Sequence, residues 1–542
     1  MTVPESTLPT LISPHNRALP LLTLTDLRIL ETQAAAALPR HTLMSRAGKA
    51  AASYLQEQIT RDPSIEKSKH KVWVVAGPGN NGGDALIVAA ELHQAGIAVD
   101  LCMPLEVKPD DARWALDTAR AAGVAMTSTP PASLESYTWL VDGMFGIGLT
   151  RPLDGVFATI ARQLSQRTKA KSRRGGVLAL DTPSGLDSDT GTVVGEKQNQ
   201  GGGRSENQND GAATVHATHT ITFIGAKPGL FTAQGRDLAG TVTVAPIGID
   251  STSRTAVQLN APELFADFLP PRDFATNKGT FGSLAVVGGD TGMCGAPILA
   301  SRAALYTGAG KVHVALLGDG APPYDPPHPE LMLHAIDDLP LDKMDALAVG
   351  CGMGVRDIAT RVMHDVLTLD VPKLFDADAL NLISTDPSLA AKVTARGVQG
   401  DPCVLTPHPL EAARLLGTDA PGVQRNRLAA ARALAARFAA VVVLKGTGTV
   451  IAAPDGRVAI NPTGNAALAT GGTGDVLGGI IGALLAQHLP RYEAALAGVY
   501  LHGLAADTLS AQGHGPAGLT AGELAPMVRT LLNRMFYPAT GG

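Results

Sequence analysis

The chain has 542 residues, more than a single hydrophobic core normally supports, so we expect two or more domains. Its hydrophobic fraction of 45% is ordinary for a globular protein. The formal net charge of -5 gives no electrostatic footprint for a nucleic acid. These properties favour small-molecule substrates over polyanions.

The cysteine pattern and the distribution of apolar residues exclude two further classes. The four cysteines are far apart and form no C-x-x-C pair, so neither a zinc site nor a disulfide framework is predicted. No apolar run reaches the about 18 residues that a membrane span needs. The first residues also lack a basic segment followed by an apolar one. We therefore expect a cytoplasmic protein that does not contact a membrane.

Short runs of Val, Ile, Leu and Ala alternate with longer amphipathic segments in the first half of the chain, which is the rhythm of an α/β domain. The runs that we predict to be strands lie at residues 72–76, 97–103, 140–141 and 177–180. A polar segment at residues 195–211 contains three consecutive glycines and is predicted to be a flexible surface insertion.

The loop at residues 77–84, Gly-Pro-Gly-Asn-Asn-Gly-Gly-Asp, lies between a predicted strand and a predicted helix. It satisfies the G-x-G-x-x-G pattern, and Asp100 ends the next strand, so an NAD-binding interpretation is open. Asn80, Asn81 and Asp84 add oxygen-bearing side chains that could instead hold a cation or polar ligand groups. A third interpretation is structural, with Asx turns and a helix N-cap at Asp84.

Two further acidic loops follow predicted strands, at residues 141–149 and 180–187. In a parallel sheet, such loops meet in one crevice beyond the carboxyl ends of the strands. Two carboxylates could hold a hard cation there with the Ser184 hydroxyl, while a third serves as an acid or a base. Each Asp could equally be a turn or cap residue.

The α/β pattern restarts in the second half, with predicted strands at residues 283–287, 312–317, 346–349, 404–406 and 441–444. Between the halves, residues 261–272 change in composition and contain paired prolines, which suit a connection. We therefore place one α/β domain at residues 1–261 and a second at residues 262–542.

The most informative segment is the glycine-rich loop at residues 469–479, which leads into an apolar helix. Glycines let main-chain N–H groups converge on a phosphate, and Asp475 is placed to remove a proton from a hydroxyl. The alternative is that Asp475 only caps a helix at residues 476–485. A second loop, at residues 444–449, presents Lys445 and small hydroxylated residues, as a nucleotide phosphate requires.

Taken in order, these segments resemble the bifunctional NAD(P)H-hydrate repair enzymes, in which an NAD(P)HX epimerase domain precedes an ADP/ATP-dependent NAD(P)HX dehydratase domain. The resemblance covers almost the whole chain. It implies a Rossmann-like three-layer domain followed by a ribokinase-like α/β domain. The motifs that carry it lie at residues 43–48, 77–84, 142–149, 181–191, 278–295, 406–409, 445–449 and 471–479.

For the first domain, the resemblance implies a site for the hydrated dinucleotide, with Asp181 as the acid or base of epimerisation. Asn81, Asp142 and Ser184 would ligate potassium. The residues expected to contact the substrate are Asn80, Asn81, Gly82, Gly83, Asp84, Gly146, Ile147, Gly148, Leu149, Thr150, Arg151, Pro152 and Asp181.

For the second domain, the resemblance implies phosphorylation of the C6 hydroxyl of the hydrate, with Asp475 as the base and the main chain at 471–474 stabilising the phosphoryl group. Mg²⁺ would accompany ADP or ATP, with Glu411 either orienting it through water or serving only as a first-turn residue of a helix. The expected nucleotide contacts are Lys445, Gly446, Thr447, Gly448, Thr449 and Gly474, and the expected hydrate contacts are Ala296, Gly352, His408 and Asp475.

The substrates implied are NADHX and NADPHX, and we expect a homo-oligomer. The chain departs from its relatives at Cys351, where proline is frequent, and at Ala85 and Leu410, where glycine is frequent. We expect Cys351 to affect local rigidity more than chemistry. Two alternatives stay open, a ribokinase-like small-molecule kinase and a first domain that only binds nucleotides.

Overall fold

The computed structural model describes residues 11–61, 66, 69–169, 175–196, 212–251, 255–320 and 322–537. The chain divides into two compact units. The N-terminal unit comprises Met1–His15 and Leu19–Val257, and the C-terminal unit comprises Asn16–Ala18 and Gln258–Gly542. Most of the insertion predicted at 195–211 lies outside the described residues.

The N-terminal unit is built on a parallel sheet whose described strands follow the order β3-β2-β1-β4-β5-β6-β7. The order reverses between β1 and β4, as in Rossmann-like folds. All four strands predicted from the first half are confirmed, as β1, β2, β4 and β5. The strands are β1 (Lys71–Ala76), β2 (Ala98–Cys102), β3 (Ala125–Thr127), β4 (Trp139–Gly143), β5 (Gly176–Leu180), β6 (His219–Phe223) and β7 (Thr241–Ala245).

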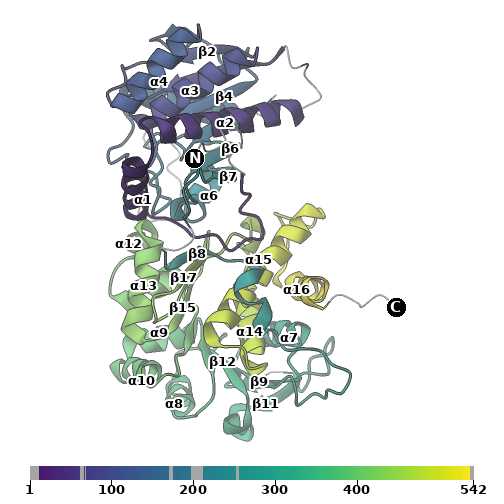
Figure 1. Ribbon diagram of the computed structural model, residues 1–542. Helices are drawn as coiled ribbons and strands as arrows, with labels where there is room; N and C mark the ends of the chain where they lie inside the picture. The colour runs from purple at the N-terminus through teal and green to yellow at the C-terminus, as the bar shows by residue number, and fades with distance from the viewer. Residues whose placement is uncertain are drawn as a thin grey trace. The chain divides into compact units, whose positions relative to one another are not determined.

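Two separate hydrophobic clusters cover the two faces of this sheet, which makes the N-terminal unit three-layered. Strand β1 divides its side chains between them, because successive residues of a strand point to opposite faces. Val72 and Val74 join the cluster with α2, α3 and α4, whereas Trp73 and Val75 join the cluster with α5. The helices are α1 (Leu24–Ala37), α2 (Thr42–Arg61), α3 (Asn80–Gln94), α4 (Asp110–Ala121), α5 (Gly155–Lys169), η2 (Pro228–Leu230) and α6 (Gly235–Leu238) (Figure 1).

The C-terminal unit has a larger sheet, in which the described strands follow the order β11-β10-β9-β12-β13-β14-β15-β16-β17-β8. Pairing is parallel from β11 to β15 and antiparallel from β15 to β17. All five strands predicted from the second half are confirmed, as β9, β10, β12, β14 and β15. The strands are β8 (Val257–Leu259), β9 (Ser283–Gly288), β10 (Lys311–Leu316), β11 (Met332–Ala335), β12 (Ala346–Val349), β13 (Lys373–Phe375), β14 (Val404–Leu405), β15 (Val441–Leu444), β16 (Val450–Ala452) and β17 (Val458–Ile460).

Helices border the parallel part of this sheet, as parallel crossover connections require. They are α7 (Gly295–Thr307), α8 (Asp357–Val366), α9 (Asp378–Thr385), α10 (Pro387–Val398), α11 (Pro409–Leu416), α12 (Ala420–Arg425), α13 (Arg427–Phe438), α14 (Thr473–Ala486), α15 (Arg491–Ala511) and α16 (Ala521–Phe536), with short 3₁₀ turns η3 (Pro262–Leu264), η4 (Ala266–Phe268), η5 (Ile336–Asp338), η6 (Leu341–Lys343) and η7 (Ala466–Leu468). Within the described ranges, no helix is both long enough and apolar enough to cross a bilayer.

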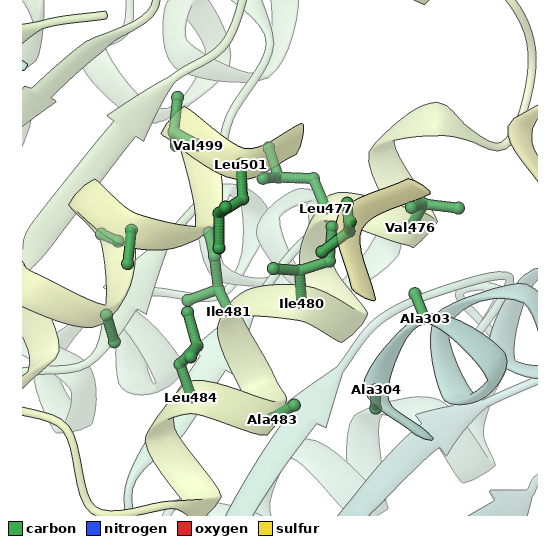
Figure 2. Close-up of a cluster of buried hydrophobic side chains, with 14 of the residues drawn as sticks. Ala303, Ala304, Val476, Leu477, Ile480, Ile481, Ala483, Leu484, Val499 and Leu501 are labelled. Atoms are coloured by element: carbon green, nitrogen blue, oxygen red, sulfur yellow. The ribbon is translucent and has the colours of Figure 1, made fainter. Parts of the chain in front are cut away.

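Helix α14 is the centre of the C-terminal core and carries Asp475 in its first turn. Figure 2 shows its apolar side chains packed among residues of α7 and α15. Glycines permit this packing, because a Cβ on Gly479 would lie 2.7 Å from the carbonyl carbon of Ala300 in α7. The buried residues of α14 in this cluster include Val476, Leu477, Ile480, Ile481, Ala483, Leu484 and Leu485.

Candidate active sites

A cavity of about 590 Å³ opens in the N-terminal unit at the carboxyl ends of β1, β4, β5 and β6. Loops from neighbouring parallel strands meet at this edge, which is where α/β sheets bind ligands. Helix α1 supplies another wall through Leu24, Leu27, Arg28 and Glu31. Of the substrate contacts predicted from sequence, the cavity is lined by Asn80, Asn81, Asp84, Gly146, Ile147, Gly148, Leu149 and Asp181.

The remaining substrate contacts predicted from sequence do not line the cavity. A Cβ on Gly82 would meet the main chain of Gly77, and one on Gly83 would lie 2.7 Å from the Cε of Met44. These glycines therefore allow close packing at the start of α3, and neither they nor Thr150, Arg151 and Pro152 are among the cavity-lining residues. Their contact with a substrate stays a prediction.

The start of α3 resolves the N-cap alternative for Asp84. The helix begins at Asn80 with Gly79 as its N-cap, so the N-cap interpretation of Asp84 is wrong. Asp100 accepts from Tyr137 Oη at 2.7 Å and pairs with Lys71 Nζ at 2.6 Å. It is not among the residues that line the cavity, so the ribose contact of a dehydrogenase finds no support here.

Asp181 faces this cavity from the end of β5, in a left-handed backbone conformation with φ of 65°. Such a conformation is unfavourable for a residue with a Cβ and is typical of functional sites. Its Oδ1 lies 2.5 Å from Nζ of Lys227, which is 1% exposed. Lys227 follows β6 and had no place in the sequence prediction. The only feature of the sequence that could have indicated it is its position shortly after β6, a strand that was itself not predicted.

Asp84 faces the same cavity from the second turn of α3. Burial raises the pKa of its carboxyl group well above the ordinary value, and the negative charge of Asp181 raises it further. Burial also raises the pKa of Glu31 in this cavity, whereas Asp181 is paired with the cation Lys227. A carboxyl group with a raised pKa beside a cation-paired carboxylate offers both halves of acid–base catalysis.

The predicted potassium ligands Asp142 and Ser184 lie together behind the cavity. Asp142 is fully buried and accepts hydrogen bonds from the main chain and hydroxyl of Ser184 at 2.8 and 2.7 Å. Burial raises the pKa of Asp142 to about 6, although the Ser184 hydrogen bonds oppose that shift. The main chain of Asn81 passes close to Gly143, the residue after Asp142.

The carboxamide of Asn81 is the unusual feature of this region. It is buried, and neither its oxygen nor its nitrogen has a hydrogen-bond partner among the described residues. An unpaired buried polar group is costly and calls for a ligand, a water or an ion. In the described part of the chain, no set of three His, Cys, Asp or Glu side chains is placed to hold a metal. A site made of amide, hydroxyl and carboxylate oxygens suits a hard cation such as potassium.

In the C-terminal unit, the predicted dehydratase residues gather at the carboxyl ends of β12, β13, β14 and β15. These strands are neighbours in the parallel sheet, so their following loops share one edge. Lys445 Nζ lies 2.5 Å from Oδ1 of Asp376, which follows β13. A Cβ on Gly474 would lie 3.7 Å from that same Nζ and 4.0 Å from Oδ2 of Asp376. The nucleotide loops predicted at 445–449 and 471–474 therefore meet.

Asp376 is a central residue of this site that the sequence prediction missed. It is 2% exposed and holds Lys445 between itself and Glu411, whose Oε2 lies 4.0 Å from Nζ. Burial alone would lower the pKa of Lys445, but Asp376 and Glu411 raise it overall. The available signal was the pair Asp376 and Asp378 directly after the short apolar strand β13.

His408 and Glu411 form the N-terminal cap of α11. Nδ1 of His408 accepts from the main-chain N–H groups of Leu410 and Glu411 at 3.1 and 3.2 Å, and Glu411 Oε2 accepts from the His408 N–H at 2.7 Å. Both residues therefore have a structural role, and this agrees with the first-turn alternative for Glu411. Burial raises the pKa of Glu411 to about 7, which Lys445 opposes.

Asp475 is the third residue of α14, whose N-cap is Gly472, so the interpretation of Asp475 as the cap is wrong. Burial raises its pKa, while a hydrogen bond from the Cys351 thiol lowers it. Cys351 is 1% exposed and lies close enough to Asp475 for each group to affect the pKa of the other. Our expectation that Cys351 affects rigidity more than chemistry stays a prediction.

The remaining predicted residues occupy the edges of the same region. A Cβ on Gly352 would lie 3.4 Å from the Cβ of Ala296, so these two expected hydrate contacts are neighbours beside Cys351. In the other loop, Gly446 and Gly448 have φ of 133° and 61°, which side-chain-bearing residues rarely adopt. Thr449 Oγ1 donates to the Gly446 carbonyl at 3.0 Å and closes that turn, which also contains Thr447.

A Rossmann-like unit with an acid–base cavity, followed by an α/β unit in which a lysine loop meets a glycine-rich helix start, defines a two-domain enzyme of nucleotide-type substrates. Comparison with known proteins agrees. Residues 284–528 match the family model of NAD(P)H-hydrate dehydratase, and residues 40–229 match that of the YjeF-related protein N-terminus.

The chain is 36% identical over 521 residues to the bifunctional NAD(P)H-hydrate repair enzyme Nnr of Escherichia coli, covering 94% of this chain and 93% of that protein. It is 50% identical over 264 residues to the ADP-dependent (S)-NAD(P)H-hydrate dehydratase of Neisseria meningitidis, covering 48% of this chain and 88% of that one. A crystal structure of the ADP/ATP-dependent NAD(P)H-hydrate dehydratase of Bacillus subtilis has 33% identity and a TM-score of 0.45, and the match covers 51% of this chain and 98% of that chain. The chain belongs to the family of bifunctional NAD(P)H-hydrate repair enzymes.

Proposed function

We propose that this protein repairs hydrated NADH and NADPH with two activities. The N-terminal unit interconverts the R and S hydrates, and the C-terminal unit dehydrates the S hydrate with ADP or ATP as the phosphoryl donor. The observation that carries the proposal is full-length similarity to bifunctional repair enzymes together with two separate clusters of reactive groups, one per unit.

In the dehydratase, Asp475 removes the proton of the C6 hydroxyl while the oxygen attacks the terminal phosphorus of the nucleotide. Main-chain N–H groups at 471–474 and the Lys445 ammonium stabilise the charge on the transferring group. Phosphate then leaves C6 with the electron pair of the C–O bond, and a proton leaves C5. The products are the reduced nicotinamide, phosphate, and AMP or ADP.

In the epimerase, Asp181 accepts the proton of the C6 hydroxyl as the C6–N1 bond opens. The electron pair of that bond goes to N1, which takes a proton from the neutral carboxyl group of Asp84. Rotation of the resulting aldehyde and reversal of both proton transfers close the ring on the opposite face. The raised pKa of Asp84 supports its assignment as the proton donor.

Asn81, Asp142 and Ser184 are the residues that would hold potassium, which would supply positive charge beside the cavity. Buried carboxylate and unpaired carboxamide both support this assignment. Potassium should raise the unfolding midpoint of the N-terminal unit above that in sodium at equal ionic strength, and Asp142→Asn should remove the difference. The three tryptophans, Trp73, Trp114 and Trp139, all lie in this unit, so their fluorescence reports its unfolding alone.

Magnesium would enter the second site with the nucleotide, because Mg²⁺ is usually held through phosphates and one or two carboxylates. Asp376 and Glu411 are the carboxylates next to Lys445 that could orient it, directly or through water. We also propose a cytoplasmic homo-oligomer, which size-exclusion chromatography with light scattering and fractionation of cells would test.

The deciding experiment incubates purified protein with a mixture of R and S hydrated NADH, magnesium and potassium, and compares ADP, ATP and no nucleotide. Nucleotide-dependent recovery of NADH beyond the S fraction, faster than spontaneous epimerisation, is the expected result. Recovery that stops at the S fraction would contradict the epimerase. A stable phosphorylated product without NADH would point to a small-molecule kinase instead.

A further inference from the structure

The ammonium group of Lys227 uses all of its hydrogen-bond donors within the protein. Its three protons have three acceptors within hydrogen-bonding distance: Asp181 Oδ1 at 2.5 Å, Thr222 Oγ1 at 2.6 Å and the Phe223 carbonyl at 2.8 Å. The side chain is 1% exposed. An ammonium with three donors used has none left for a substrate. Whatever Lys227 does in the cavity, it does through Asp181.

The two carboxylate oxygens of Asp181 have different surroundings. Oδ1 is occupied by Lys227, whereas Oδ2 points toward the loop after β4, where a Cβ on Gly146 would lie 3.2 Å from it. Gly146 lines the cavity, so Oδ2 is the oxygen on the substrate side. The left-handed backbone of Asp181 and the anchoring of Oδ1 together leave its carboxylate one orientation.

The loop that carries Lys227 is locked against the loop that carries Asp181. The main-chain N–H of Gly229 donates to the Ser188 carbonyl at 2.7 Å. A Cβ on Gly229 would lie 2.5 Å from the Asp187 carbonyl oxygen and 2.7 Å from the nitrogen of Gly191, so only glycine fits between these segments. This interlocking holds Lys227 in register with Asp181 although 46 residues separate them.

The other charged groups of the cavity give the Lys227–Asp181 ion pair a second role. Glu31, Asp84 and Asp111 also line the cavity, so Asp181 shares it with three further carboxyl groups. Lys227 is the cation within hydrogen-bond distance of Asp181, so it offsets this accumulation of negative charge. Arg28 lines the opposite wall on α1.

We propose that Lys227 is the positioning residue of the epimerase, which holds the Asp181 carboxylate and directs its free oxygen at the C6 hydroxyl without itself touching the substrate. This inference rests on the proposed epimerase function. It predicts that changes at Lys227 lower kcat while KM changes little, because the lysine makes no substrate contact.

The test follows conversion of purified S-NADHX to the R epimer by chromatography, without nucleotide, so that the dehydratase is idle. Lys227→Met should lower kcat by about 100-fold, the cost of a misplaced catalytic group. Lys227→Arg keeps the charge but not the length and should recover part of that loss. Thr222→Val removes one of the three acceptors, together with the Thr222 hydroxyl that lies 3.4 Å from Asp181 Oδ1, and should lower kcat several-fold with an unchanged KM. Tryptophan fluorescence during unfolding checks that each variant is folded.

Asp181→Asn separates this inference from the proposed function. If the wild-type protein does not epimerise faster than the spontaneous rate, the proposed function fails. If the wild type does and Asp181→Asn does not, an unchanged kcat in folded Lys227→Met overturns the positioning role. Should Lys227→Met not fold, Thr222→Val decides, and an unchanged kcat there overturns the proposal. A rise in KM alone would also overturn it, because it would make Lys227 a binding residue.

Discussion

Gly479 offers a sharp test of how the core of the C-terminal unit places Asp475. Gly479 lies four residues after Asp475 in α14, where the helix crosses α7. A Cβ there would lie 2.7 Å from the carbonyl carbon and 2.9 Å from the Cα of Ala300, closer than the 3.0 Å that real Cβ atoms keep. Because the neighbour is backbone, it cannot rotate away, and Gly479→Ala must push the two helices apart.

The expected size of the effect follows from two opposing terms. Overpacking of a core costs about 1–3 kcal/mol, and a backbone clash belongs at the upper end. Replacing glycine by alanine inside a helix stabilises the helix by about 1 kcal/mol. The net destabilisation is therefore about 2 kcal/mol, which for a unit of this size lowers the unfolding midpoint by roughly 4–8 °C. Gly522→Ala in α16 is the matched control, because its Cβ would meet nothing within 4 Å.

Circular dichroism follows both units during heating, whereas tryptophan fluorescence follows only the N-terminal one. For Gly479→Ala, we expect an earlier transition by circular dichroism, an unchanged fluorescence transition and a slower dehydratase with normal epimerisation. A shift of about 1 Å in Asp475 can cost up to about 100-fold in rate. The reasoning is refuted if Gly479→Ala unfolds at the same midpoint as Gly522→Ala or above it.

Three more predictions concern the C-terminal unit. Asp376→Asn should destabilise it by about 1–3 kcal/mol, because the half-buried Lys445 loses its nearer carboxylate and keeps only Glu411, and denaturant unfolding that matches wild type would contradict this. Cys351→Ala should lower the dehydratase kcat by removing the thiol donor to Asp475, and Cys351→Ser should restore it; equal rates in both would exclude that contact. Lys373 is 1% exposed, and burial lowers its pKa from 10.5 to about 8, so the folded state releases this proton before the unfolded state does. Stability should therefore rise with pH between about 8 and 10.5, and Lys373→Met should remove about 3 kcal/mol of that rise in unfolding free energies measured across this range.

The sequence alone determined the α/β class, nine of the strands and the loops that form the two sites. Buried parallel strands appear as short apolar runs, so their positions can be predicted without knowing their neighbours. Glycine-rich loops at strand ends indicated the phosphate-type site around Asp475 and the cavity around Asp181. Strand β6 was missed because His and Thr interrupt its apolar pattern, and β13 was missed because it has only three residues and begins with Lys.

Only the tertiary structure decided which side chains meet within each site. Lys227 lies 46 residues from Asp181, and Asp376 lies 69 residues from Lys445, so no local pattern links the partners. A parallel sheet brings the carboxyl ends of its strands together whatever their separation in the chain. Packing then sets the surroundings of each residue: Gly82 allows close packing against the main chain of Gly77, and Cys351 lies near enough to Asp475 to affect its pKa.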